Sequence, residues 1–328
     1  NYKDVTVDYT LTVKHRKVTV TGNNGNKVYG EADPELTATV AGTVGKDKVK
    51  YTVAREAGED VGHYSVIPTG EEIQGNYKVT YKNGDFEITK AGTMTLTPEL
   101  TGKDAEKVYD GQPLSGGATA TVKEGTKITY STDGGETWSE TLPSITDVGI
   151  LNVTAKAENK NYKDVTVDYT LKVTRKAVTV TADNKSKVFG EKDPELTATV
   201  TGTIGKDTVE YTLSRKAGED VGTYTITPSG KAEQTNYKVT YATGTLTITK
   251  AETMTLTPEL TGKDAEKEYD SKPLSGGATA SVTKGTKITY STDGGKTWSE
   301  TLPSITNVGT LNVTAKAENK NYKDVTVD

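Results

Sequence analysis

Few residues in this chain carry the side chains that catalysis or metal binding needs. The sequence has two histidines and no cysteine, which excludes disulfides and thiolate metal sites. In the second copy of the repeat described below, His63 is replaced by Thr223 and is therefore not an essential base or ligand. His15 aligns in the same way with Thr174. Because nucleophilic catalysis needs an activating base, we expect no enzyme activity, no metal site and no cofactor.

Acidic side chains cluster at two places, Glu59-Asp60 and residues 104–110. Grouped carboxylates can bind Ca²⁺, but a calcium loop places its ligands at alternating positions. Neither cluster has that spacing, so we interpret both as solvated turns.

One octapeptide combines hydroxyl, carboxylate and indole groups, and it occurs twice, at residues 131–138 and 291–298. It reads S-T-D-G-G-x-T-W and resembles the Asp box of sialidases and other β-propeller proteins. In that family the Asp accepts N–H groups of a turn, the Gly provides the bend and the Trp packs beneath. The resemblance implies a structural hairpin at these residues: Ser131, Asp133, Gly135, Trp138, Ser291, Asp293, Gly295 and Trp298.

Sugar binding and sialidase activity are the alternatives for this octapeptide. A propeller needs several blades of about 40–50 residues each. The two octapeptides lie 160 residues apart, so a propeller is disfavoured.

The elements that position this hairpin belong to an internal repeat. The sequence NYKDVTVD begins at Asn1, Asn161 and Asn321, with a spacing of 160 residues. Such a period indicates serially duplicated units. Each period divides again into two related halves, A and B, because short motifs around KVY, TATV, DVG and NYK recur in the same order in both halves.

Four modules and a leading segment follow from this pattern. Residues 1–16 are predicted as the tail strand of a preceding B module, 17–91 as A1, 92–175 as B1, 176–251 as A2, and 252–328 as a C-terminally truncated B2.

Alternating Val, Thr and Tyr predict strands throughout, as in residues 77–81 (YKVTY). Asn83-Gly84 follows that run and predicts a tight hairpin turn. A hydrophobic content of 32% suits small cores. We therefore expect an all-β chain: a tandem array of small, mainly antiparallel β modules, either Ig-like sandwiches or β-grasp-like. Because the joints lack Gly, Pro or Ser tracts, the array should form an elongated rod.

The A modules carry the ordered motifs YGxxDPxL, DVGxY and NYxVTYxxGxLTITKA, the last complete at residues 236–251. In A2, Phe189 replaces the Tyr29 that opens the first motif. This order resembles the MBG repeats (YGX type) of bacterial surface proteins, and the B modules resemble a sister type with YDGxPL. The resemblance implies large cell-wall-anchored or secreted adhesins, and it carries no catalytic residues.

Composition narrows the choice of partners. The chain has 40 basic and 45 acidic residues, a net charge of −5, and they are intermingled, which argues against nucleic acid. No apolar run approaches transmembrane length, so we expect no membrane insertion in this segment. Neighbouring repeats of the same chain are the expected partners, together with a host glycoprotein or immunoglobulin.

We expect the structural stalk of a large surface adhesin, which projects a functional domain from the cell wall of a Gram-positive bacterium. Repeated weak contacts would add multivalent adhesion. The expected location is extracellular, at the bacterial cell surface or cell wall. A module that binds host glycan, mucin or immunoglobulin is the alternative, and a glycosidase-associated module is the least favoured.

Overall fold

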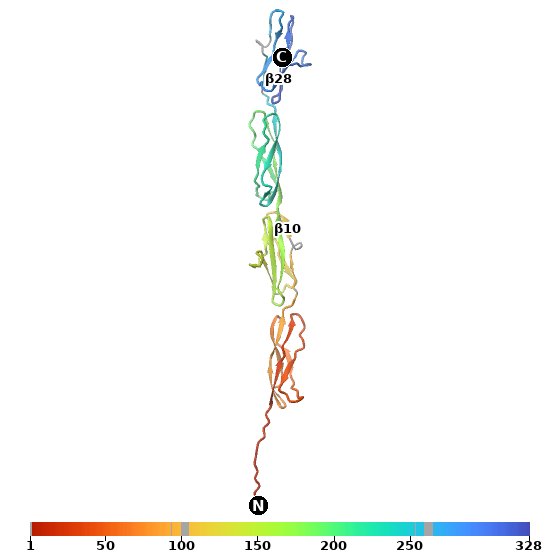
Figure 1. Cartoon of the computed structure of the whole chain (residues 1–328), viewed down its shortest axis with the longest axis vertical. Helices are drawn as coiled ribbons and strands as arrows, with labels where there is room; N and C mark the ends of the chain where they lie inside the picture. Colours follow the sequence, from red (N-terminus) through yellow and green to blue (C-terminus); the bar gives the residue numbers. More distant parts are fainter. Residues whose placement is uncertain (1, 93, 100–104, 253, 259–264) are drawn as a thin grey trace. The chain divides into compact units, whose positions relative to one another are not determined.

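The computed structural model describes residues 2–92, 94–99, 105–252, 254–258 and 265–328 (Figure 1). The regular elements of these residues are all strands, which confirms the all-β prediction. None of the described segments forms a helix long and apolar enough to cross a membrane. The chain divides into two compact units: Asn1–Lys107 with Gln112–Val173, and Val108–Gly111 with Thr174–Asp328.

The first unit begins with two four-stranded sheets, of order β3-β1-β7-β6 and β2-β8-β5-β4. Two strand pairs are parallel, β1 with β7 and β2 with β8, and the others are antiparallel. The strands are β1 (Arg16–Gly22), β2 (Gly25–Val28), β3 (Ala38–Ala41), β4 (Thr52–Arg55), β5 (Gly62–Thr69), β6 (Ile73–Gln74), β7 (Tyr77–Lys82) and β8 (Gly84–Thr89).

Side chains alternate between core and solvent along these strands, because successive residues of a strand point to opposite faces. In β1, Val18 and Val20 are buried while Arg16 and Lys17 are exposed. The second sheet buries Phe86 and Ile88 of β8 in the same alternation.

The predicted hairpin at Asn83-Gly84 is wrong. These residues join β7 to β8, but β7 pairs with β1 and β8 pairs with β2, so the chain passes here from one sheet to the other. A Cβ on Gly84 would clash with the carbonyl oxygen of Gly22, so glycine is needed because two backbones approach closely. In the second unit Thr243 stands in place of Asn83, but Gly244 is retained.

The first unit continues with the sheet β10-β16-β15-β13 and the pairs β11-β14 and β12-β9. The long antiparallel strands β15 and β16 supply the core, where Val153, Ala155, Tyr169 and Leu171 are almost fully buried. The strands are β9 (Leu96–Pro98), β10 (Ala105–Val108), β11 (Leu114–Ser115), β12 (Ala118–Ala120), β13 (Thr126–Ser131), β14 (Ser144–Ile145), β15 (Gly149–Asn159) and β16 (Val165–Thr174).

The second unit repeats this order of sheets: β19-β17-β23-β22, β18-β24-β21-β20, β25-β27, β26-β29 and β28-β30-β31. Residues 2–15, which contain the predicted tail strand, are exposed and lie in no strand. The strands of the second unit are β17 (Lys176–Ala182), β18 (Lys185–Val188), β19 (Ala198–Thr201), β20 (Thr212–Arg215), β21 (Gly222–Ser229), β22 (Glu233–Gln234), β23 (Tyr237–Ala242), β24 (Gly244–Thr249), β25 (Leu256–Pro258), β26 (Leu274–Ser275), β27 (Ala278–Ala280), β28 (Thr286–Ser291), β29 (Ser304–Ile305), β30 (Thr314–Asn319) and β31 (Val325–Val327).

Candidate functional site

The predicted hairpin residues of the first unit meet in the turn that follows β13. The Ser131 hydroxyl donates to Asp133 Oδ1 at 2.6 Å and accepts the Gly135 N–H at 2.8 Å. The Thr137 N–H and hydroxyl both donate to Asp133, at 3.0 and 2.5 Å. These donors, Ser131 first, hold the pKa of the Asp133 carboxyl well below its usual range. The carboxylate therefore organises the turn.

Trp138 closes the hairpin without being enclosed by it. Its Nε1–H donates to the carbonyl oxygen of Gly135 at 3.1 Å, and its side chain remains 38% exposed. The Lys156 ammonium lies 5.7 Å from the centre of the indole ring, within the range of a cation–π contact. The arrangement leaves an exposed aromatic surface beside a positive charge.

The second unit builds the same turn from Ser291, Asp293, Gly295 and Trp298. The Gly295 N–H donates to Ser291 Oγ at 2.8 Å, and Trp298 is again 38% exposed. Hydrogen bonds, that from the Thr297 hydroxyl first, lower the pKa of Asp293 to about 2. The structure thus brings together all eight residues named from the sequence, four in each turn, and their structural role stays a prediction.

A cluster of four charged residues in the first MBG-like segment was not predicted. Lys27 and Arg55 have almost no exposed side-chain surface, and both bind Asp33: Lys27 Nζ lies 2.6 Å from Oδ1 and Arg55 Nε 2.6 Å from Oδ2. Glu59 pairs with the same two cations. The hydrogen bond from Arg55, and then that from Lys27, lowers the pKa of Asp33 to about 2. Lys187, Arg215, Asp193 and Glu219 form the same cluster in the second unit.

This cluster stabilises charges and does not activate them. Hydrogen bonds to Asp33 and Glu59 raise the pKa of Lys27, so its amine stays protonated and is no nucleophile. Asp33 likewise stays an anion, which is the unreactive form of a carboxyl in amide formation. The cluster fixes the loop that carries Asp33 to strand β4. The recurrence of all four charges at a spacing of 160 residues was the signal that could have revealed it.

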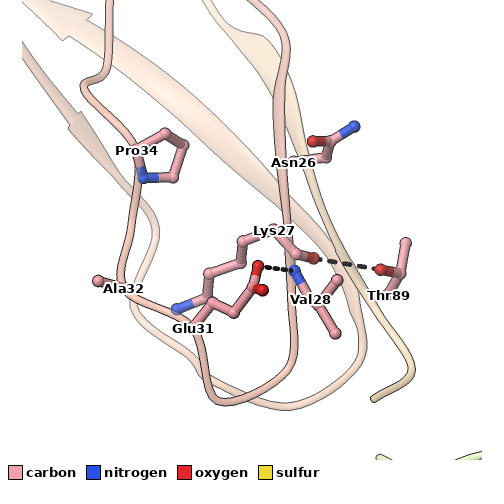
Figure 2. A pocket seen from close by; sticks show the side chains of 7 residues that line it. All are labelled: Asn26, Lys27, Val28, Glu31, Ala32, Pro34 and Thr89. Carbon is pink, nitrogen blue, oxygen red and sulfur yellow. Dashed lines mark hydrogen bonds between the residues drawn. The ribbon is translucent and has the colours of Figure 1, made fainter. Parts of the chain in front are cut away.

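A pocket of about 370 Å³ lies beside this loop (Figure 2). Its polar groups bond to one another: the Val28 N–H donates to Glu31 at 3.2 Å, and the Thr89 hydroxyl donates to the carbonyl oxygen of Lys27 at 3.3 Å. A ligand site needs convergent polar groups that are available, so we assign no ligand to this pocket. It is lined by Asn26, Lys27, Val28, Glu31, Ala32, Pro34 and Thr89.

Within the first unit, the turn that precedes β16 contacts the first two sheets through side chains. The Asn161 side-chain amide donates to Asp60 Oδ1 at 2.8 Å and accepts the Val61 N–H at 2.9 Å. Lys160 Nζ lies 2.8 Å from Asp60 Oδ2. Lys160 first, and then Asn161, lowers the pKa of Asp60. One amide thus binds a carboxylate and a backbone N–H that belong to adjacent residues.

Backbone and ring contacts extend the same interface. The Ala91 N–H donates to the carbonyl oxygen of Asn161 at 2.9 Å, and the Lys163 N–H donates to that of Ala91 at 3.1 Å. The rings of Tyr29 and Tyr162 meet edge to face, with centroids 5.5 Å apart.

The second unit has the same contacts at the equivalent positions. The Asn321 amide donates to Asp220 at 2.9 Å and accepts the Val221 N–H at 2.8 Å. Phe189 and Tyr322 meet with centroids 5.4 Å apart, so the hydroxyl of the aromatic partner is not required. The sequence identified DVG and NYK as markers of the repeat, but it did not indicate that they touch.

Comparison with solved structures finds only distant likenesses. One is a three-Ig structure of titin domains I67–I69, an E-to-A variant, with 10% identity over 69% of this chain and 96% of that chain, at a TM-score of 0.29. Another is Drosophila N-cadherin EC1-4, with 14% identity over 97% of this chain and 92% of that chain, at a TM-score of 0.24. Likenesses at this level carry no argument. No curated protein matches the chain.

Comparison with protein families is more informative. The family described as MBG domain (YGX type) matches residues 18–87 and 178–247, together less than half of the chain. The two ranges fall on the first two sheets of each unit, where the YGxxDPxL, DVG and NYxVTY motifs lie. Residues 18–87 and 178–247 are two MBG domains of the YGX type.

Proposed function

We propose that this chain is the structural repeat region of a bacterial surface adhesin, a stalk that projects a functional domain from a Gram-positive cell wall. The carrying observation is the contact between each MBG domain and the turn at Asn161 or Asn321, which recurs with the same partners in both units. A spacer needs joints that restrict bending, and combined backbone and side-chain contacts do this. The family, which resembles repeats of bacterial surface proteins, supports an extracellular place.

The same proposal divides the chain into modules 17–91, 92–175, 176–251 and 252–328, with residues 1–16 assigned to a preceding module. The two MBG ranges support the first and third of these, since each lies inside one module. The segments between them are then a second, non-catalytic module type, which alternates with the MBG domain.

Labelling of intact cells tests the location. Antibodies raised against this chain should label intact source cells in flow cytometry, and brief protease treatment of those cells should remove the label. An antibody against a cytoplasmic protein is the control for cell integrity. Labelling that appears only after permeabilisation would contradict the proposal.

Binding of host glycan, mucin or immunoglobulin is a second candidate, favoured by one observation. Trp138 and Trp298 each leave 38% of their surface exposed at equivalent places, and exposed Trp rings are frequent anchors of binding surfaces. An array of these ligands should then bind the chain, more weakly after Trp138→Ala and not at all after Trp138→Ala with Trp298→Ala, because two weak sites act by avidity. Equal binding by the wild type and the double variant would exclude this surface.

A further inference from the structure

We propose that one end of each MBG domain is a recognition site for a four-residue partner, the N-Y-K-D turn of the module that follows it. The turn is Asn161–Asp164 in the first unit and Asn321–Asp324 in the second. Recognition of this turn, and not the connecting segment alone, fixes the two modules against each other. The inference deepens the proposed stalk function by naming what stiffens its joints.

Each residue of the first turn meets a different group of the MBG domain or of the residues that follow its last strand. Asn161 binds through its side chain and its carbonyl oxygen, Tyr162 through its ring and Lys163 through its N–H. Asp164 receives the Lys90 ammonium, with Nζ 3.4 Å from Oδ1. We call the opposing set the docking surface: Tyr29, Asp60, Val61, Lys90 and Ala91.

The docking surface requires an amide at the first turn position. It presents a carboxylate acceptor, Asp60, directly beside a backbone donor, the Val61 N–H. Only an Asn or Gln side chain offers both a donor and an acceptor to such a pair. A carboxylate at position 161 would face the Asp60 carboxylate, and an alanine would leave the Val61 N–H without its acceptor.

The connecting residue is itself part of the interface. Ala91 lies between Asn161 and Lys163 in a parallel β-bridge centred on Tyr162, and Ala251 lies in the same bridge with Tyr322. A residue whose N–H and C=O are both bonded to the next module cannot act as a free hinge. The joint therefore depends on contacts made about 100 residues away along the chain as well as on the connection itself.

Comparison of the two units separates this surface from the rest of the domain. Positions elsewhere vary, as in Glu56 and Lys216 or His63 and Thr223. The docking surface and the turn are identical in both units except that Phe189 replaces Tyr29, and this change preserves the ring contact. The geometry is also the same, since the Asn amide to Asp distances are 2.8 and 2.9 Å.

Amide exchange measured by NMR on the full chain tests the proposal through Asn161→Ala. The Ala91 N–H donates to the backbone carbonyl of residue 161, which this substitution keeps. Faster exchange at Ala91 therefore reports separation of the two surfaces and not the removal of its own acceptor. We expect exchange at Ala91 to accelerate about tenfold or more, from the loss of charge-assisted hydrogen bonding. Leu171, in the core of β16, should keep its protection and show that the module stays folded.

The second unit provides a matched control. Asn321→Ala should accelerate exchange at Ala251 and leave Ala91 unchanged, because Ala251 makes the equivalent bond. Unchanged protection of Ala91 in Asn161→Ala, or equal acceleration at Ala91 and Ala251, would overturn the proposal.

An exchange of donor and acceptor gives a sharper test. Asn161→Asp places two carboxylates together and should open the joint more than Asn161→Ala does. Adding Asp60→Asn restores one donor opposite one carboxylate, and residue 161 can still accept the Val61 N–H. Protection of Ala91 should return in this double variant. A double variant no better than Asn161→Asp would refute pairing of these two residues.

Distance measurements give an independent readout of orientation. The chain has no cysteine, so Thr80→Cys and Thr166→Cys, both exposed positions, would carry the only two spin labels. We expect one narrow distance distribution in this background and a broader one after Asn161→Asp; equal widths would contradict the proposal. Neither result depends on where the chain resides in the cell, so failure of the antibody experiment and failure of this one are distinguishable.

Discussion

One turn offers a direct measurement of backbone strain, because its two copies differ by one residue. Gly75 precedes β7 with φ +56°, and Thr235 precedes β23 with φ +43°. An L-residue with a side chain loses about 1–2 kcal/mol in this left-handed region, since its Cβ approaches the following carbonyl oxygen. A Cβ built on Gly75 meets nothing within 4 Å. The cost of a side chain there therefore lies in the backbone alone.

Thr235→Gly should stabilise the second MBG domain by about 1 kcal/mol. The substitution removes about 1–2 kcal/mol of strain, and the greater freedom of glycine in the unfolded chain offsets about 0.4–1 kcal/mol of this gain. For a domain of this size, such a change raises the midpoint of thermal unfolding by about 4–8 °C. Gly75→Thr should lower the midpoint of the first MBG domain by a similar amount.

Differential scanning calorimetry of the full chain measures both effects. Several domains will give several transitions, so amide exchange in β7 and β23 should identify which transition belongs to which domain. Thr235→Asn is the matched control and should fall between Thr and Gly, because Asn tolerates positive φ better than a β-branched residue. Transitions that do not move, or two reciprocal substitutions that shift stability in the same direction, would refute the reasoning.

Three further predictions concern the first unit. The pKa of Asp33 is lowered from 3.8 to about 2, so its contribution to stability should be complete above pH 3.8 and lost as the pH falls through 2; acid unfolding followed by circular dichroism should lose this dependence in Asp33→Asn. Gly84→Ala should destabilise the first MBG domain by about 1–3 kcal/mol, since the new Cβ meets the Gly22 carbonyl; an unchanged urea midpoint would contradict the crossing of backbones there. Asp133→Ala, in a Trp298→Phe background, should shift Trp138 fluorescence to the red because the hairpin loses its central acceptor, and an unmoved spectrum would show that the turn holds without it.

The features that could be predicted from the sequence are those encoded over a few residues. Val18 and Val20 alternate with polar neighbours because one face of β1 is buried, and this pattern is sufficient to predict a strand. The hairpin around Asp133 was equally accessible, since its hydrogen-bond partners lie within four residues of it. Local chemistry determines such elements.

The features that could not be predicted depend on residues far apart in the chain. Asn83-Gly84 has the composition of a tight turn, but the pairing of β7 with β1 joins residues 61 positions apart and overrides that local preference. The contact of Asp60 with Asn161 spans 101 residues, and neither residue is unusual in its own surroundings. Only the fixed separation of DVG and NYK in both copies of the repeat linked them.

The parallel pairing of the first and last strands of the MBG domain determines how it responds to tension. Force applied to the two ends of the domain pulls β1 and β2 backwards and β7 and β8 forwards, so each parallel pair is sheared along its length. Six residue pairs between β1 and β7 and four between β2 and β8 then carry the force at the same time. An antiparallel pair of terminal strands would instead open one hydrogen bond after another, like a zip. The MBG domain is therefore arranged to resist elongation when its ends are drawn apart.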